Sequence, residues 1–156
     1  MARRASFTVE QEGLTETIRA FNKLERELER PAANRELRGA AGDCSRVLVG
    51  ELVAAAERSG VPVARRVAAS IRVKSDRIPS VQIGGTKKVG RTGAIAAKLM
   101  WGSEHGPAAE ADRNRFGVGR GPGYWIAPTV ERFQGSKALD AYNRALYQIM
   151  RRYKLI

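Results

Sequence analysis

The chain has 156 residues, which suits one domain with a hydrophobic core and leaves little room for two. Its single cysteine and single histidine exclude an internal disulfide and a structural zinc site built from soft ligands. The net charge of +12 favours DNA, RNA or an acidic protein surface as a partner, and charge alone does not distinguish among these.

Charge and hydropathy are unevenly distributed along the chain. Residues 1–60 contain ten Lys or Arg and ten Asp or Glu, whereas residues 61–156 contain eighteen and six, so the whole surplus lies in the second part. No run of about eighteen apolar residues is present, and residues 1–13 lack the apolar segment of a signal peptide. We therefore expect a soluble protein that is made in the cytoplasm and does not enter a membrane.

Two amphipathic helices are predicted in the first 60 residues, after a short strand at 6–13. In the first helix, apolar residues recur at steps of three and four: Leu14, Ile18, Phe21, Leu24 and Leu28. Pro31 interrupts this pattern and is expected to be an early residue of the second helix. That helix repeats the spacing, and Ser59 and Gly60 end it. Its predicted buried stripe is Leu37, Ala41, Cys44, Leu48, Leu52 and Ala55.

The middle of the chain combines a predicted hairpin with glycine-rich segments. After a short helical turn that follows Pro62, residues 70–76 and 80–84 are predicted to pair as antiparallel strands. Ten of the 16 glycines lie between residues 84 and 123, and the segments 84–93 and 106–123 are expected to be long mobile loops. Between them a short helix is predicted to bring Met100 and Trp101 into the core.

The last third predicts a brief strand edge and a C-terminal helix. Tyr124 and Ile126 suit the strand edge, and Pro128 is expected to begin a helical turn. Ser136 is predicted to cap the final helix. The predicted buried stripe of that helix is Leu139, Tyr142, Leu146, Ile149 or Met150, and Tyr153. The fold class is therefore α+β in a single domain: two N-terminal amphipathic helices and a C-terminal helix packed on a small antiparallel sheet, with long Gly-rich loops.

Three short motifs could belong to a nucleotide-binding or catalytic site. GVGRGPG at 117–123 has proline at the sixth place of a dinucleotide fingerprint and is followed by aromatic residues, not by a helix N-terminus. Ser103, Glu104 and His105 are adjacent, so their side chains point in different directions and suit a polar turn better than a triad. Cys44 lies on an apolar stripe, where a buried thiol is ordinary. We expect no catalytic, cofactor-binding or metal site, and we assign Trp101, Trp125 and Pro128 to the core and strand geometry.

Basic residues gather in the predicted strands and loops, which raises nucleic-acid binding. They are Arg65, Arg66, Arg72, Lys74, Lys87, Lys88, Arg91, Arg113, Arg115 and Arg120. The aromatic side chains that would stack on bases are expected in the core, and no helix has the pattern of a recognition helix. Contact with a phosphate backbone without sequence specificity is compatible with this pattern.

The order of these parts resembles the tail-completion (neck) proteins of long-tailed bacteriophages, a family of small α+β proteins encoded with the head–tail joining set. In that family the stretch after the paired helices reads Pro-Val, a Thr-Gly turn and a Ser-Ile pair. Here Pro62 and Val63 match, as do Ser70 and Ile71, whereas ARRVAA replaces the turn.

Two further motifs extend the resemblance over nearly the whole chain. The family's segment of Glu, an aromatic and Gly corresponds to Glu104, His105 and Gly106, with His in the aromatic place. Residues 124–132, YWIAPTVER, correspond to an apolar strand followed by Pro-Ala and a helix. Each motif is short, so the order of all of them carries the resemblance.

The resemblance implies a non-enzymatic subunit of a ring, commonly a hexamer, at the head–tail junction of the virion, assembled in the host cytoplasm without a cofactor. It would complete the tail end for joining to the DNA-filled head. Its partners would be copies of itself, neighbouring neck and tail proteins, and genomic DNA in the lumen by non-specific contact. The segments 84–93 and 106–123 would be mobile in the monomer and ordered in the ring. The candidate contact residues are Lys87, Lys88, Arg91, Glu104, His105, Arg113, Arg115 and Arg120.

Several alternatives stay open at this point. The tail terminator and the head-side stopper are also small α+β ring proteins. A basic nucleic-acid-binding protein of the ribosomal or nucleoid kind would share the charge. A small nuclease is disfavoured because the acidic residues are not clustered. Whether the basic face meets DNA or an acidic protein is likewise open.

Overall fold

The computed structural model describes residues 26, 31–91, 93–107, 113–116 and 124–154. The described part combines helices with two small antiparallel sheets, as the α+β prediction requires, but the strands form two separate hairpins and not one sheet. The elements in chain order are α2 (Pro31–Arg58), α3 (Ala64–Ala68), β1 (Arg72–Val73), β2 (Val81–Gln82), β3 (Lys88–Val89), β4 (Ala94–Ile95), α4 (Ala96–His105), α5 (Arg113–Phe116), α6 (Ile126–Phe133) and α7 (Lys137–Arg152).

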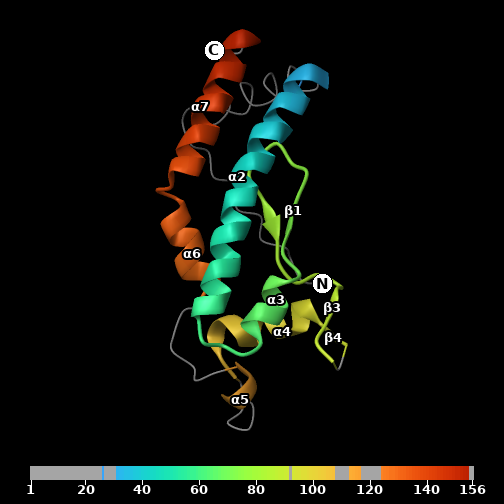
Figure 1. The fold of residues 1–156 in the computed structure, drawn as a ribbon. Coiled ribbons are helices and arrows are strands. Elements are labelled where there is room, and N and C mark those ends of the chain that lie inside the picture. Colours follow the sequence, from blue (N-terminus) through green and yellow to red (C-terminus); the bar gives the residue numbers. More distant parts are fainter. Residues whose placement is uncertain (1–25, 27–30, 92, 108–112, 117–123, 155–156) are drawn as a thin grey trace, which may run out of the picture.

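Helix α2 is the central element, and the other parts are arranged along it (Figure 1). It begins at Pro31, a position where the missing N–H of proline costs nothing. It ends at Arg58, and Gly60 then takes a positive φ of 70° that favours glycine. The whole predicted stripe is buried, which confirms the helix and its face. The buried residues of α2 are Ala33, Leu37, Ala41, Cys44, Ser45, Leu48, Leu52, Ala55 and Ala56.

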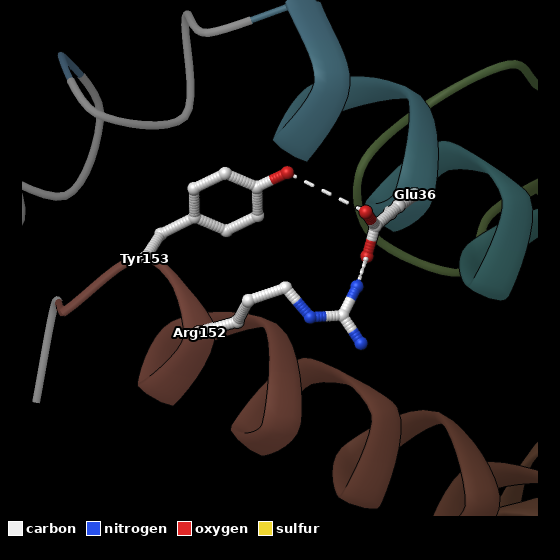
Figure 2. A network of polar contacts seen from close by, with 3 residues as sticks. All are labelled: Glu36, Arg152 and Tyr153. Atoms are coloured by element: carbon white, nitrogen blue, oxygen red, sulfur yellow. Dashed lines mark hydrogen bonds and ion pairs between the residues drawn. The ribbon is translucent and has the colours of Figure 1, made fainter.

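Helix α7 runs antiparallel to α2 and covers its N-terminal half, while α6 covers the C-terminal half (Figure 1). Ser136 caps α7 as predicted, since its Oγ accepts a hydrogen bond from the Leu139 N–H at 3.2 Å. At the far end, the Glu36 carboxylate accepts from Arg152 Nη1 at 2.7 Å and from the Tyr153 hydroxyl at 3.4 Å (Figure 2). This ion pair is exposed, so the apolar contact of Ile149 with α2 contributes more to the packing.

The predicted hairpin is formed by β1 and β2, with Val73 opposite Val81, although both strands are shorter than the pattern indicated. Two hydrogen bonds fix its tip. The Ser80 N–H donates to Ser45 Oγ on α2 at 2.9 Å, and the Tyr142 hydroxyl on α7 donates to the Arg77 carbonyl at 2.8 Å. The tip is therefore held by the two long helices together.

A second hairpin is formed by β3 and β4, whose first strand and turn lie in the segment 84–93 that the sequence predicted to be a loop. Strands β3 and β4 pair antiparallel, with Val89 opposite Ala94, and the Val89 side chain is buried. Gly90 and Gly93 have φ of 73° and 63°, so they supply the left-handed backbone of a tight turn. These glycines form a tight turn. The number of glycines in a segment does not distinguish a tight turn from a flexible loop.

Two predictions about the aromatic residues are wrong. Trp101 is not in the core, because 65% of its surface is exposed, whereas Trp125 is 1% exposed. Tyr124 and Ile126 form no strand edge, since α6 already begins at Ile126. Pro128 does not begin the helical turn as predicted, because α6 begins two residues earlier, and Pro128 lies in the first turn of that helix.

Some predicted segments lie outside the described residues. These are the strand at 6–13, the first helix at 14–28 except Arg26, and most of the loop at 106–123. Arg26 is helical and exposed.

We predict that Tyr142→Phe lowers the free energy of unfolding by about 1 kcal/mol at neutral pH, because the buried hydroxyl loses its bond to the Arg77 carbonyl. Burial raises the pKa of Tyr142 above its ordinary value of 10.0, and negative charge at Cys44 and Asp76 raises it further. The folded protein thus keeps a proton that the unfolded chain releases above pH 10, so wild-type stability falls there.

The difference between wild type and Tyr142→Phe should therefore shrink as the pH rises past that value. Urea denaturation of both proteins at neutral pH and at about half a unit above the ordinary tyrosine pKa measures it. A difference that stays constant or grows would contradict the assignment.

Candidate functional site

Five elements gather at one end of the molecule: α3, β3, β4, α4 and α5 (Figure 1). We call this end the basic pole. Among the described residues of these elements and the turns joining them, Glu104 is the only acidic one. The exposed basic residues are Arg65, Arg66, Lys87, Lys88, Arg91, Lys98, Arg113 and Arg115.

The Glu104 side chain is buried at 3% exposure and caps α6 from the end of α4. One carboxylate oxygen, Oε2, accepts from the Trp125 N–H at 3.0 Å and from the Ile126 N–H at 2.7 Å, and Oε1 accepts from the Ala127 N–H at 2.7 Å. These amides begin α6 and have no acceptor within the helix. A carboxylate there also interacts favourably with the helix dipole. Glu104, predicted as a contact residue, thus lies inside and joins two helices.

Ser103 extends the same arrangement to the buried tryptophan. The Trp125 Nε1–H donates to Ser103 Oγ at 3.3 Å, and Ser103 Oγ donates to the Met100 carbonyl at 2.7 Å. The Tyr124 N–H donates to the Glu104 carbonyl at 2.8 Å. Ser103 and Glu104 were predicted to lie in a polar turn. Instead they connect α4 to residues 124–127 through hydrogen bonds.

The outer face of α4 carries an exposed aromatic pair. Lys98, Trp101 and His105 follow each other at steps of three and four, which places them on one face of the helix. The rings of Trp101 and His105 stack with centroids 5.5 Å apart and an interplanar angle of 16°. Sequence reasoning missed this surface. Trp101 lies two residues from Leu99 and from Ser103, which face the core, so its exposure follows only once the buried face of α4 is known.

Helix α5 is attached to α4 through Phe116. A Cβ placed on Gly102 would lie 2.6 Å from the Phe116 ring, so the ring occupies space that only glycine leaves free. The Arg115 guanidinium lies 5.3 Å from the centroid of the same ring. These contacts hold the short helix α5, which carries Arg113 and Arg115, against α4.

The remaining predicted contact residues lie on or near the second hairpin. Lys87 Nζ donates to the Ala69 carbonyl at 2.6 Å and so ties the hairpin to the end of α3. Lys88 and Arg91 are exposed on the strand and its turn. Arg120 lies outside the described residues. The structure thus brings Lys87, Lys88, Arg91, His105, Arg113 and Arg115 to one end.

The described part of the chain contains no group of three or more His, Cys, Asp or Glu side chains that could hold a metal ion. Burial raises the pKa of the Cys44 thiol, which disfavours the reactive thiolate. None of the described helices is long and apolar enough to cross a bilayer.

The chain matches no protein-family model, no curated protein and no solved structure. The resemblance to tail-completion proteins is therefore carried by the order of the motifs alone.

We predict that Glu104→Gln lowers the free energy of unfolding by about 2 kcal/mol, because the neutral amide keeps one acceptor oxygen for three N–H groups that two carboxylate oxygens now satisfy. Glu131→Gln is the matched control on the exposed side of α6 and should change stability by less than about 0.5 kcal/mol. Chemical denaturation of both variants tests this, and equal stabilities would show that the carboxylate cap contributes nothing.

Helical glycines offer a second comparison. Gly39→Ala meets no atom within 4 Å and should stabilise α2 by about 0.5–1 kcal/mol through helix propensity. Gly102→Ala has the same intrinsic gain but displaces Phe116, so a net loss of about 1 kcal/mol or more is expected. Melting temperatures of the two variants should move in opposite directions. A stabilised Gly102→Ala protein would mean that Phe116 does not hold α5 on α4.

Proposed function

We propose that this protein is a non-enzymatic structural subunit of the phage head–tail junction, which forms a ring and completes the tail end for joining to the DNA-filled head. The motif order supports the family. The observation that carries an assembly role is the basic pole, where Trp101 is exposed on α4 at the same end of the molecule as the exposed basic side chains.

An exposed tryptophan of this kind favours a protein partner. Trp101 exposes most of a large apolar surface, and tryptophan and arginine are the residues that most often dominate the binding energy of protein interfaces. Lys98 on the same face of α4, and the exposed Arg91 and Arg115 at the same end of the molecule, would steer an acidic surface toward this pole. Because Glu104 is buried, it offsets little of this field at the surface.

The charge also bears on how a ring would form. Subunits with a net charge of +12 repel each other, so closure of a ring by free subunits is disfavoured. An acidic neighbour that covers the basic poles would remove this repulsion. The proposal therefore favours assembly on a template made by an adjacent neck or tail protein, with free subunits staying apart.

One observation favours a second candidate, a basic nucleic-acid-binding protein. The stacked Trp101 and His105 rings, flanked by lysine and arginine, resemble the platforms on which single-stranded bases stack. This candidate predicts tight binding of single-stranded DNA or RNA by the isolated protein, with a steep dependence on salt.

The binding of purified partners tests the proposal. Trp101→Ala should weaken binding to the adjacent neck or tail protein at least about tenfold, as expected when an interface anchor is removed. Tyr147→Ala is the matched control, because Tyr147 is also exposed, at 55%, and lies on α7 away from the pole. Interferometry or native mass spectrometry measures the difference. Equal binding by both variants would overturn the proposal.

Charge reversal at Lys88, Arg91 and Arg115 should also block head–tail joining while leaving the fold intact. Virions lacking the protein distinguish the ring candidates: overlong tails indicate a terminator, leaking heads a stopper, and normal tails beside full heads the completion role. Salt-sensitive nucleic-acid binding that is lost in Trp101→Ala would favour the second candidate.

A further inference from the structure

An apolar groove runs between α2 and the α6–α7 segment, away from the basic pole. It consists of two adjoining hollows of about 360 and 240 Å³, which share Val47 and Ala138 as lining residues. The lining of the smaller hollow includes Ala40, Ala141 and Ala145. These small side chains leave room for larger apolar groups, and Val47 is 48% exposed at the junction.

The chain itself carries an apolar stripe, and the first half of that stripe matches the stretch of α2 from Ala40 to Val47 that lines the groove. The spacing of Leu14, Ile18, Phe21, Leu24 and Leu28 would place these side chains on one face of a helix over 14–28. Arg26 is described as helical and exposed, and it lies on the opposite face from this stripe. Five large apolar side chains on one stripe require a surface to cover them, since an isolated helix of this length is marginal in water.

The connection to α2 fixes where such a helix can lie. Only residues 29 and 30 separate the stripe from Pro31, the first residue of α2. A connection this short makes two helices antiparallel neighbours. Fifteen helical residues span about 22 Å and the distance from Pro31 to Val47 along α2 is about 24 Å, at a rise of about 1.5 Å per residue. Phe21 then falls level with Ala40, and Leu14 falls level with Val47.

We propose that residues 14–28 form an amphipathic helix that docks in this groove of the same chain, antiparallel to α2, with Phe21 over Ala40 and Leu14 over Val47. The short tether gives this segment an effective concentration in the millimolar range or above. A second copy has no such advantage, and it would bring together two chains that each carry +12. The proposal does not depend on the function proposed above.

Disulfide trapping in the full-length chain tests the position. Leu14→Cys and Val47→Cys are combined with Cys44→Ala, which removes the only native thiol. Oxidation should link the two positions within one chain. Leu14→Cys with Val53→Cys is the matched control, because Val53 is also exposed on α2 but faces another side, and it should not link. Linked dimers would assign the groove to a second copy, and no link in either pair would also overturn the proposal.

A second comparison leaves Cys44 in place, in case its replacement disturbs the core. Phe21→Asp puts a charge on the stripe, whereas Asn22→Asp puts it on the adjacent, off-stripe position. Amide hydrogen exchange of residues 14–28 should speed up on the order of a hundredfold in Phe21→Asp, from the lost burial of one aromatic side chain, and should stay unchanged in Asn22→Asp. Equal exchange in the two variants would overturn the docking.

Discussion

The buried carboxylate of Glu104 is the constraint on which the rest of the structure depends. The first turn of α6 presents backbone N–H groups that have no acceptor within the helix, and three of them, from Trp125 to Ala127, point at this one side chain. Because Glu104 belongs to α4, satisfying these groups also joins the basic pole to the α2–α6–α7 body. Trp125 then enters the core beside Ser103. Removing the carboxylate would leave buried polar groups unpaired, which costs more than the bonds contribute.

The same constraint shapes the surface that the proposed function uses. Because Ser103 and Glu104 face the interior, Trp101 and His105 face outward on α4. Gly102 has no side chain, so the Phe116 ring packs against α4 at that position. Among the described residues of the basic pole, the one acidic side chain is thereby buried. A rigid, basic and aromatic surface results, which suits an acidic protein partner in an assembly. The groove on the other side of α2 is apolar and suits the chain's own N-terminal stripe.

Parts of this structure follow from local pattern, and parts do not. Local sequence predicts the buried faces of α2 and α7, the Ser136 cap and the first hairpin. The spacing of apolar residues and the identity of a capping residue are both visible within a few residues of each element. The second hairpin was missed because Gly90 and Gly93 indicate a turn only when their backbone angles are known. The start of α6 was missed because its cap comes from Glu104, about twenty residues earlier. The exposure of Lys88, Arg91 and Arg115 is predictable from their charge, whereas the exposure of Trp101 required knowing which face of α4 is buried.

The most direct measurement of the central claim is the exchange of individual backbone amides in the wild-type protein, followed by NMR. If Glu104 caps α6, the N–H groups of Trp125, Ile126 and Ala127 should exchange only on global unfolding, although the first amides of a helix ordinarily exchange fast. Exchange of these three amides at the rate of an unprotected peptide would contradict the account, because α4 and α6 would then not be joined by this carboxylate.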